Sequence, residues 1–286
     1  FVAGDMVLVT GVTVGLVFEE LEILMMKFVV SCLAVFSCLM GIAEAQDRDS
    51  WEWTIAPYLW ASDVGLDLTV NDDTTIGGDA AFKDLLDKVD SVFMGHFEGR
   101  KGRWGMYLDT IYLDLSDSNT VAVGPGGPIL GDLTVDAGMT MRLYDAGGIF
   151  RLSEAEADTQ FDLLAGVRYI DLDIAADLTL PGPAMTPVNI RTGPSETDLM
   201  LGARIIRKFA DRWHWALRGD TSFGGTEGTY NGLATMGYTF GQSRLFTLTA
   251  GYRYTAIDMD GSTQRGNPTQ ADIKLSGPIL GFVFNF

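Results

Sequence analysis

The last ten residues, 277–286, read GPILGFVFNF. Successive side chains of a β-strand point to opposite faces, so this stretch places its bulky apolar groups on one face and smaller or polar groups on the other. The residues of the apolar face are Leu280, Phe282, Phe284 and Phe286. A strand of this kind predicts a sheet with one apolar surface.

The same alternation recurs upstream of the terminal strand. Together with 34 glycines and 11% aromatic residues, it favours a single all-β unit. After residue 46 no stretch is apolar for 18 residues, so no transmembrane helix is expected there. Ten strands are predicted, at residues 51–70, 91–100, 104–117, 133–151, 161–180, 196–210, 213–225, 229–241, 245–260 and 272–286.

The links between these segments alternate in length. Short links are at 100–103, 153–160, 210–212 and 242–244, and long links are at 71–90, 118–132, 181–195 and 261–271. Short turns at one end and long loops at the other are typical of an antiparallel up-and-down transmembrane β-barrel. Because the link at 225–229 is brief, eight or twelve strands are the alternatives to ten. A soluble β-sandwich is disfavoured, since its strands are usually shorter.

An export signal is expected before the barrel, at residues 25–45. Lys27 precedes the apolar run 28–42, and Ala43-Glu44-Ala45 fits a small-residue cleavage site. The only cysteines, Cys32 and Cys38, fall inside this run, and acylation of either would be the lipoprotein alternative. We expect residues 1–24 to be an upstream extension from a miscalled start, and residues 46–286 to form the barrel in the cell outer membrane.

The chain resembles the small outer-membrane β-barrels of Gram-negative bacteria. The terminal strand ending in Phe286 carries this resemblance, and WEWTIAPYLWAS (51–62), FKDLLDKVD (82–90) and 93–116 are similar to an uncharacterised porin-like group. The resemblance implies the barrel architecture, a setting among membrane lipid and lipopolysaccharide, and recognition of Leu280, Phe282, Phe284 and Phe286 by the barrel-assembly machinery. It transfers no catalytic residue.

Strand parity predicts which side chains face the lumen. In 133–143 the apolar residues, including Met141 and Leu143, are expected to face lipid, and Asp136 and Arg142 the lumen. Near-equal numbers of arginines and carboxylates predict an ion-pair network, which is either a constriction for small solutes or polar filling. The expected network is Glu98, Asp109, Asp136, Arg142, Asp162, Arg168, Asp198, Arg204, Arg218, Asp220 and Arg253.

The favoured function is a structural or weakly conducting narrow pore, without enzyme activity, cofactor or metal. One alternative is a barrel-embedded hydrolase that uses His96 and Glu98 as base and orienting group. Another is surface adhesion through acidic external loops. The net charge of −18 excludes a nucleic-acid partner, which requires a basic face. In the first long loop, the spacing of Phe82, Leu85, Leu86 and Val89 predicts a short amphipathic helix over or in the barrel mouth.

Overall fold

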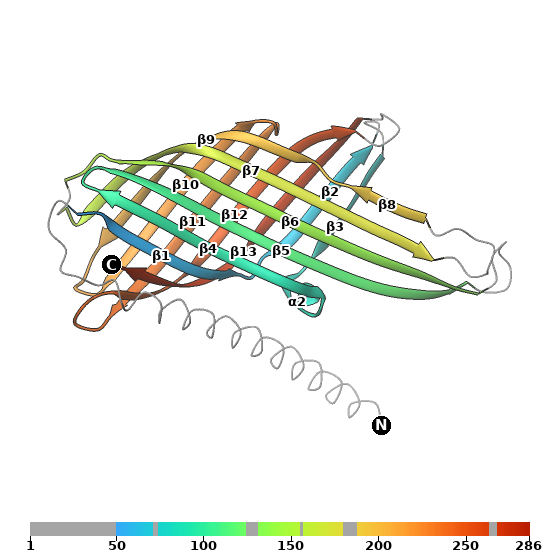
Figure 1. Cartoon of the computed structure of the whole chain (residues 1–286), viewed down its shortest axis with the longest axis horizontal. Coiled ribbons are helices and arrows are strands. Elements are labelled where there is room, and N and C mark those ends of the chain that lie inside the picture. The colour runs from blue at the N-terminus through green and yellow to red at the C-terminus, as the bar shows by residue number, and fades with distance from the viewer. Residues whose placement is uncertain (1–49, 71–73, 124–130, 155–156, 180–187, 263–267) are drawn as a thin grey trace, which may run out of the picture.

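The protein folds as a closed antiparallel β-barrel of ten strands (Figure 1). The computed structural model describes residues 50–70, 74–123, 131–154, 157–179, 188–262 and 268–286. The first strand closes the barrel by pairing with the last. The ten strands are β1 (Glu52–Trp60), β4 (Val89–Lys101), β5 (Trp104–Val123), β6 (Gly131–Arg151), β7 (Thr159–Thr179), β9 (Ser195–Lys208), β10 (Trp213–Gly224), β11 (Gly228–Phe240), β12 (Phe246–Ser262) and β13 (Pro268–Asn285). The predicted fold class and strand count are confirmed.

Three further strands and a short helical segment accompany the barrel. The predicted strand 51–70 is interrupted, and its second half, β2 (Asp63–Val70), forms a hairpin with β3 (Thr74–Ala80). The predicted helix in the first long link is confirmed as α2 (Phe82–Leu85), continued by the 3-10 helix η1 (Leu86–Lys88). The short strand β8 (Val188–Thr192) pairs with β7.

The two ends of the barrel differ as the link lengths predicted. One end, at the left in Figure 1, holds the short turns and the C-terminus. There the backbone N–H of Trp53 donates to the carbonyl of Phe286 at 2.8 Å, and the N–H of Phe286 donates back at 2.9 Å. At the opposite end β5, β6 and β7 extend beyond the other strands. The expected signal peptide, 25–45, and the segment 1–24 lie outside the described residues.

The outer face of the barrel exposes large apolar side chains on many strands, such as Leu108, Leu201, Leu217 and Leu280. Aromatic rings pack against one another beside the short turns, in pairs such as Trp104–Phe150, Trp213–Tyr238 and Phe246–Phe284. An apolar band flanked by an aromatic row is the lipid-facing surface of an outer-membrane barrel. Among the described residues, no helix is long and apolar enough to span a membrane.

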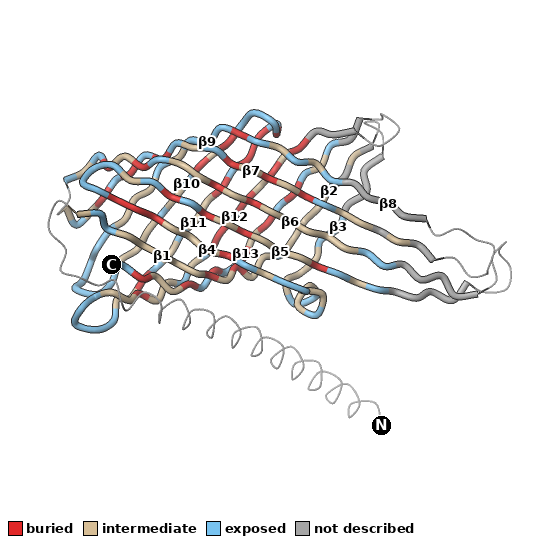
Figure 2. The backbone as a smooth tube through the Cα atoms, viewed as in Figure 1, coloured by how far each residue is buried: buried red, intermediate tan, exposed pale blue. Residues whose placement is uncertain are grey.

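The interior of the barrel is divided into two layers along its axis. Charged side chains occupy the half beside the short turns, and apolar side chains fill the half beside the long loops. We call the second group the apolar layer; it comprises Trp60, Met94, Ile111, Met141, Leu143, Ile170, Leu172, Ile257, Met259, Ile273, Leu275 and Ile279. In Figure 2 the buried segments lie in the middle of the barrel wall, on the near strands and on the far strands.

The predicted facing of 133–143 is wrong. Met141 and Leu143 are buried in the apolar layer, so the alternate residues of β6 point outward. Arg142 pairs with Asp171 outside the lumen, with its guanidinium over the ring of Tyr112. Asp136 is exposed and accepts a hydrogen bond from Ser118. The reason is that β6 extends beyond the lipid band, where outward side chains meet water and inward ones pack on the apolar layer.

Candidate functional site

The charged half of the lumen is a connected set of ion pairs, here called the ionic layer. Six arginines and five carboxylates form it, all contributed by inward-facing positions of the barrel strands. A buried charge is costly unless it is paired, and here each one has an oppositely charged neighbour. The members are Glu98, Arg100, Asp109, Asp145, Arg151, Asp162, Arg168, Arg204, Arg218, Asp220 and Arg253.

Nearest the short turns, three arginines share two carboxylates. Arg204 donates to Glu98 at 2.7 Å and to Asp162 at 2.8 Å, so it bridges β4 and β7. Arg100 donates to the same two acids, at 2.7 and 3.2 Å. Arg151 donates to Asp162 through Nε at 2.9 Å. The excess of arginine makes this part of the lumen cationic.

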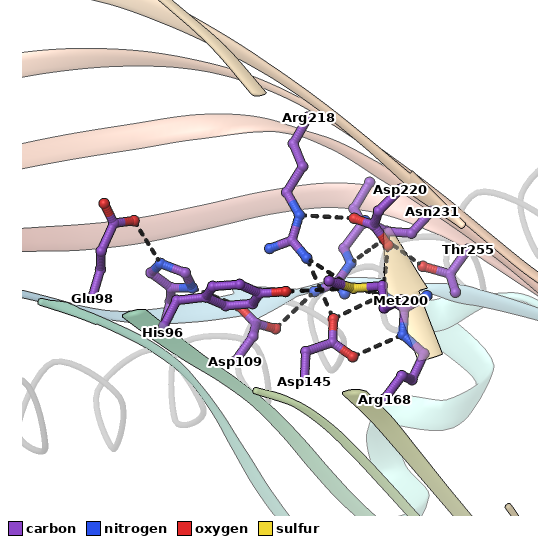
Figure 3. A network of polar contacts seen from close by, with 12 residues as sticks. His96, Glu98, Asp109, Asp145, Arg168, Met200, Arg218, Asp220, Asn231 and Thr255 are labelled. Atoms are coloured by element: carbon purple, nitrogen blue, oxygen red, sulfur yellow. Dashed lines mark hydrogen bonds and ion pairs between the residues drawn. The ribbon is translucent and has the colours of Figure 1, made fainter. Parts of the chain in front are cut away.

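A second cluster of ion pairs lies deeper in the barrel and is centred on Arg168 (Figure 3). Arg168 donates two hydrogen bonds to Asp145, at 2.7 and 2.8 Å, and one to Asp220 at 2.6 Å. Arg218 donates to Asp220 at 2.8 Å and lies 3.5 Å from Asp145. The side chains of Arg168, Asp145 and Asp220 have no solvent exposure. These three charges are therefore fully removed from solvent.

Tyr107 packs against this second cluster. The guanidinium of Arg218 lies 5.1 Å from the centre of its ring. Gly147, which is paired with Tyr107 in the β5–β6 register, leaves room for the ring, because a Cβ there would lie 3.0 Å from it. The tyrosine hydroxyl reaches the sulfur of Met200 at 3.5 Å. Aromatic and sulfur groups thus complete the packing around the charges.

Arg253 joins the ionic layer to the apolar layer. Its Nη1 lies 3.3 Å from Asp109 and donates to the hydroxyl of Tyr58 at 3.1 Å, while the guanidinium stacks 5.0 Å from the ring of Trp60. Its Nε donates to Asn231 at 2.9 Å. Polar and apolar contacts to one cation fix the boundary between the two layers.

A cavity of about 440 Å³, lined by charged and apolar side chains, extends from the short-turn end of the barrel past the ionic layer to Ile279. We call it the vestibule. It extends to residues at the strand ends, among them Glu52, Lys208 and Asn285. Arg100, Arg151, Arg204, Arg218 and Arg253 all line it. An anion in this cavity would meet more positive than negative side chains.

The structure brings most of the predicted lumen residues into the ionic layer: Glu98, Asp109, Asp162, Arg168, Arg204, Arg218, Asp220 and Arg253. Asp136 and Arg142 lie on the outer face, as described above. Asp198 is buried but makes no ion pair among the described residues; it accepts hydrogen bonds from Ser222 and from the backbone of Gly225 and Thr226. Its carboxylate is fixed by the β10–β11 turn, which satisfies it without an arginine.

Three members of the ionic layer were missed in the sequence. Arg100 lies two residues after Glu98 and therefore shares its face, but it falls in the predicted link 100–103. Asp145 and Arg151 share the parity of Leu143 on β6. The wrong facing of that strand excluded both. Leu143, Asp145 and Arg151 are separated by even numbers of residues and therefore share one face of the strand. Correct placement of Leu143 inside the barrel would have placed both charged residues there too.

His96 lies between two carboxylates. Its Nδ1 is 3.1 Å from Asp109 and its Nε2 is 3.5 Å from Glu98 (Figure 3). Neither serine nor cysteine is among the described residues that line the vestibule beside it. Within the described part of the chain, no group of three or more His, Cys, Asp or Glu residues is arranged to hold a metal ion.

The predicted assembly residues lie on the closing strand. The Phe284 ring packs on Phe246, as does the Phe282 ring, and Leu280 is exposed on the outer face. Phe286 pairs through its backbone with Trp53, as described above. The terminal strand is thus half of the seam that closes the barrel.

No protein-family model and no curated protein matches the chain. Among solved structures, the chain is similar to the outer membrane protease OmpT of Escherichia coli, with 8% identity and a TM-score of 0.45 over 86% of this chain and 99% of that one. It is also similar to Ail of Yersinia pestis (10%, 0.33, 83% and 99%) and OprG of Pseudomonas aeruginosa (11%, 0.33, 85% and 99%). Similarity at this level assigns no activity, ligand or partner.

Proposed function

We propose that the protein is a narrow, weakly conducting outer-membrane pore whose constriction is the ionic layer. The observation that carries the proposal is the narrowing of the lumen at the ionic layer: the side chains of Arg168, Asp145 and Asp220 have no solvent exposure, and the vestibule continues beside them to Ile279. An ion would pass through this narrow space beside the buried pairs, because a barrel of about ten strands has little room beyond its own side chains. Small solutes would therefore cross slowly.

The vestibule supports a preference for anions. The ionic layer has one more arginine than it has carboxylates. Arg100 lines the vestibule, and its Nη1 has no hydrogen-bond acceptor within the described residues. A cation-lined, partly enclosed space concentrates anions by its electrostatic field. We expect chloride to carry more current than potassium.

Planar-bilayer recordings of the purified protein test the proposal. The wild type should give small channels, and Arg218→Ala should give larger ones, because it removes a side chain between the vestibule and the buried pairs. Arg142→Ala is the matched control, since Arg142 lies outside the lumen. Silence of both the wild type and Arg218→Ala in all salts would overturn the pore and leave a structural role.

The proposal also assigns His96 to polar filling of the lumen instead of catalysis. Both of its ring nitrogens face carboxylates, so neither is free to accept a proton from a substrate or water. We expect His96→Ala to leave the lipid A, phospholipid and peptide profiles of producing cells unchanged. A changed profile with a normally inserted barrel would support the hydrolase instead.

Adhesion through the external loops concerns residues 118–132 and 181–195. Parts of both, 124–130 and 181–187, lie outside the described residues. Shortening these loops should leave surface binding unchanged if the pore is the main function.

Export and assembly complete the proposal. Residues 25–45 would direct export, and the terminal strand would be recognised by the barrel-assembly machinery. Deletion of Phe286 should reduce insertion, since it also removes two backbone hydrogen bonds with Trp53. The amount of heat-modifiable barrel in outer-membrane fractions measures this, with Asn285→Ser as the control.

A further inference from the structure

The barrel wall is incompletely hydrogen-bonded beside β4. Strand β1 pairs with β4 only between Glu52 and Pro57. Beyond this point the β2–β3 hairpin follows β13, and residues 89–94 of β4 have a ladder partner only in β5 among the described strands. The N–H of Trp60 donates to the sulfur of Met94 at 3.3 Å where a ladder would supply a carbonyl. We call this gap the lateral seam.

The helical segment α2–η1 lies at the lateral seam. The N–H of Phe82 donates to Asp63 on β2 at 2.8 Å. Lys88 donates to Asp117 on β5 at 2.8 Å, and this carboxylate raises the pKa of Lys88 above its ordinary value. The segment is therefore anchored to both sides of the seam.

An apolar cavity of about 340 Å³ occupies the lateral seam. Interior residues such as Met94, Ile111 and Met141 line it, and so do Leu59 and Leu280, which are paired with each other on β1 and β13. Leu280 is exposed on the outer, lipid-facing side. The cavity thus joins the apolar layer to the surface that contacts hydrocarbon. No charged residue lines it.

One polar group in this cavity's lining lacks a partner. Trp60 lines the cavity and is only 4% exposed, yet its indole Nε1 has no acceptor within the described residues. Buried indole N–H groups usually find an acceptor, and leaving a donor unsatisfied costs about 1–3 kcal/mol. Stacking on Arg253 holds the ring in place from the opposite layer. An acceptor brought by a ligand would satisfy this donor.

We propose that the lateral seam is a binding site for a neutral apolar molecule with one hydrogen-bond acceptor, which enters from the bilayer. The apolar walls exclude charged molecules, because burial of an unpaired charge is prohibitive. Burial of the hydrocarbon part supplies the affinity, and the Trp60 N–H supplies the preference for a hydroxyl, ketone or ester oxygen. The site is distinct from the ionic layer, and it adjoins the vestibule at Ile279.

Photo-crosslinking in liposomes tests this site with two probes of equal length. One is a medium-chain alkanol carrying a diazirine, and the other is the matching alkane. The alkanol should label Met94, Ile111 or Met141 inside the barrel several-fold more than the alkane. Trp60→Phe, which removes the indole N–H donor and makes the ring smaller, should abolish this difference without lowering the alkane labelling.

A pair of neighbouring substitutions on β4 supplies the matched control. Val92→Trp fills the cavity that Val92 lines and should prevent interior labelling by both probes. Phe93→Trp, at a position that is 61% exposed, should have no effect. Equal interior labelling by both probes in the wild type would overturn the proposal and indicate a lipid acyl chain in the seam. Labelling confined to outer residues would overturn it as well.

Discussion

The two layers fill the lumen of the same barrel in physically different ways. In the ionic layer the filling depends on partners, since Arg168 is stable in a site without solvent only because Asp145 and Asp220 accept its hydrogen bonds. In the apolar layer it depends on the volume of the side chains, since Ile111, Leu143 and Ile257 have no exposed surface. The comparison teaches that the interior of a membrane barrel is not polar throughout. Removing one group should therefore have different consequences in each layer.

The largest loss of stability is expected from Asp145→Ala. This change leaves Arg168 and Arg218 with only Asp220 to compensate them. Removing one partner of a buried pair typically costs about 3–5 kcal/mol. Urea unfolding in lipid vesicles measures the change in the free energy of unfolding.

The double variant Asp145→Leu with Arg168→Leu is the control for that prediction. It extends the apolar layer into the ionic layer, and replacement of both partners usually costs less than removal of one. A double variant less stable than Asp145→Ala would show that the ion pairs themselves, and not only their neutrality, stabilise the lumen.

In the apolar layer, Ile257→Ala should lower the free energy of unfolding by about 2–4 kcal/mol. Ile257 is fully buried, and the change removes apolar contacts and leaves a cavity. Vesicle unfolding again gives the value, and Leu217→Ala, at an outward position with 48% exposure, should cost less. Similar costs at both positions would mean that the apolar layer is packed no more tightly than the lipid contacts.

A substitution at the boundary between the two layers should lower the free energy of unfolding by less. Ile279 lines both the vestibule and the cavity at the lateral seam. Ile279→Val removes one methylene there, and it should cost about 0.5–1.5 kcal/mol. A rise in single-channel conductance would show that the two spaces connect at this residue. Val283→Ala, which affects only the vestibule side, serves for comparison.

The sequence predicted the barrel well because its strands alternate regularly and its links alternate in length. It predicted the ionic layer in part. On β12, the inward Arg253 and Thr255 alternate with the outward Tyr252 and Tyr254, as the simple polar-inside rule requires. On β6 the rule fails, because Leu143 packs inside and Arg142 pairs outside. The alternation of residues in the sequence shows which side chains share a face of the strand. When both faces are partly apolar, it does not show which of them contacts lipid.

The lateral seam could not be predicted for a related reason. The alternation in 51–70 continues through the interruption, so the sequence does not reveal that β1 leaves β4 after Pro57. That separation depends on the pairing of β2 with β13, about 200 residues away in the sequence. The same applies to Trp60, whose missing acceptor is defined by the surrounding fold.

The smallest effect is expected for the ion pair that lies outside both layers. Arg142 and Asp171 keep 35% and 21% of their side-chain surface exposed. Partly exposed pairs gain little, because water and salt screen the charges, so Asp171→Ala should cost less than about 1 kcal/mol. Added salt should reduce this cost further, whereas the loss in Asp145→Ala should hardly change with salt. An equal loss in the free energy of unfolding for Asp171→Ala and Asp145→Ala would show that burial does not distinguish the two ion pairs. That result would contradict the proposed difference between the lumen and the outer face.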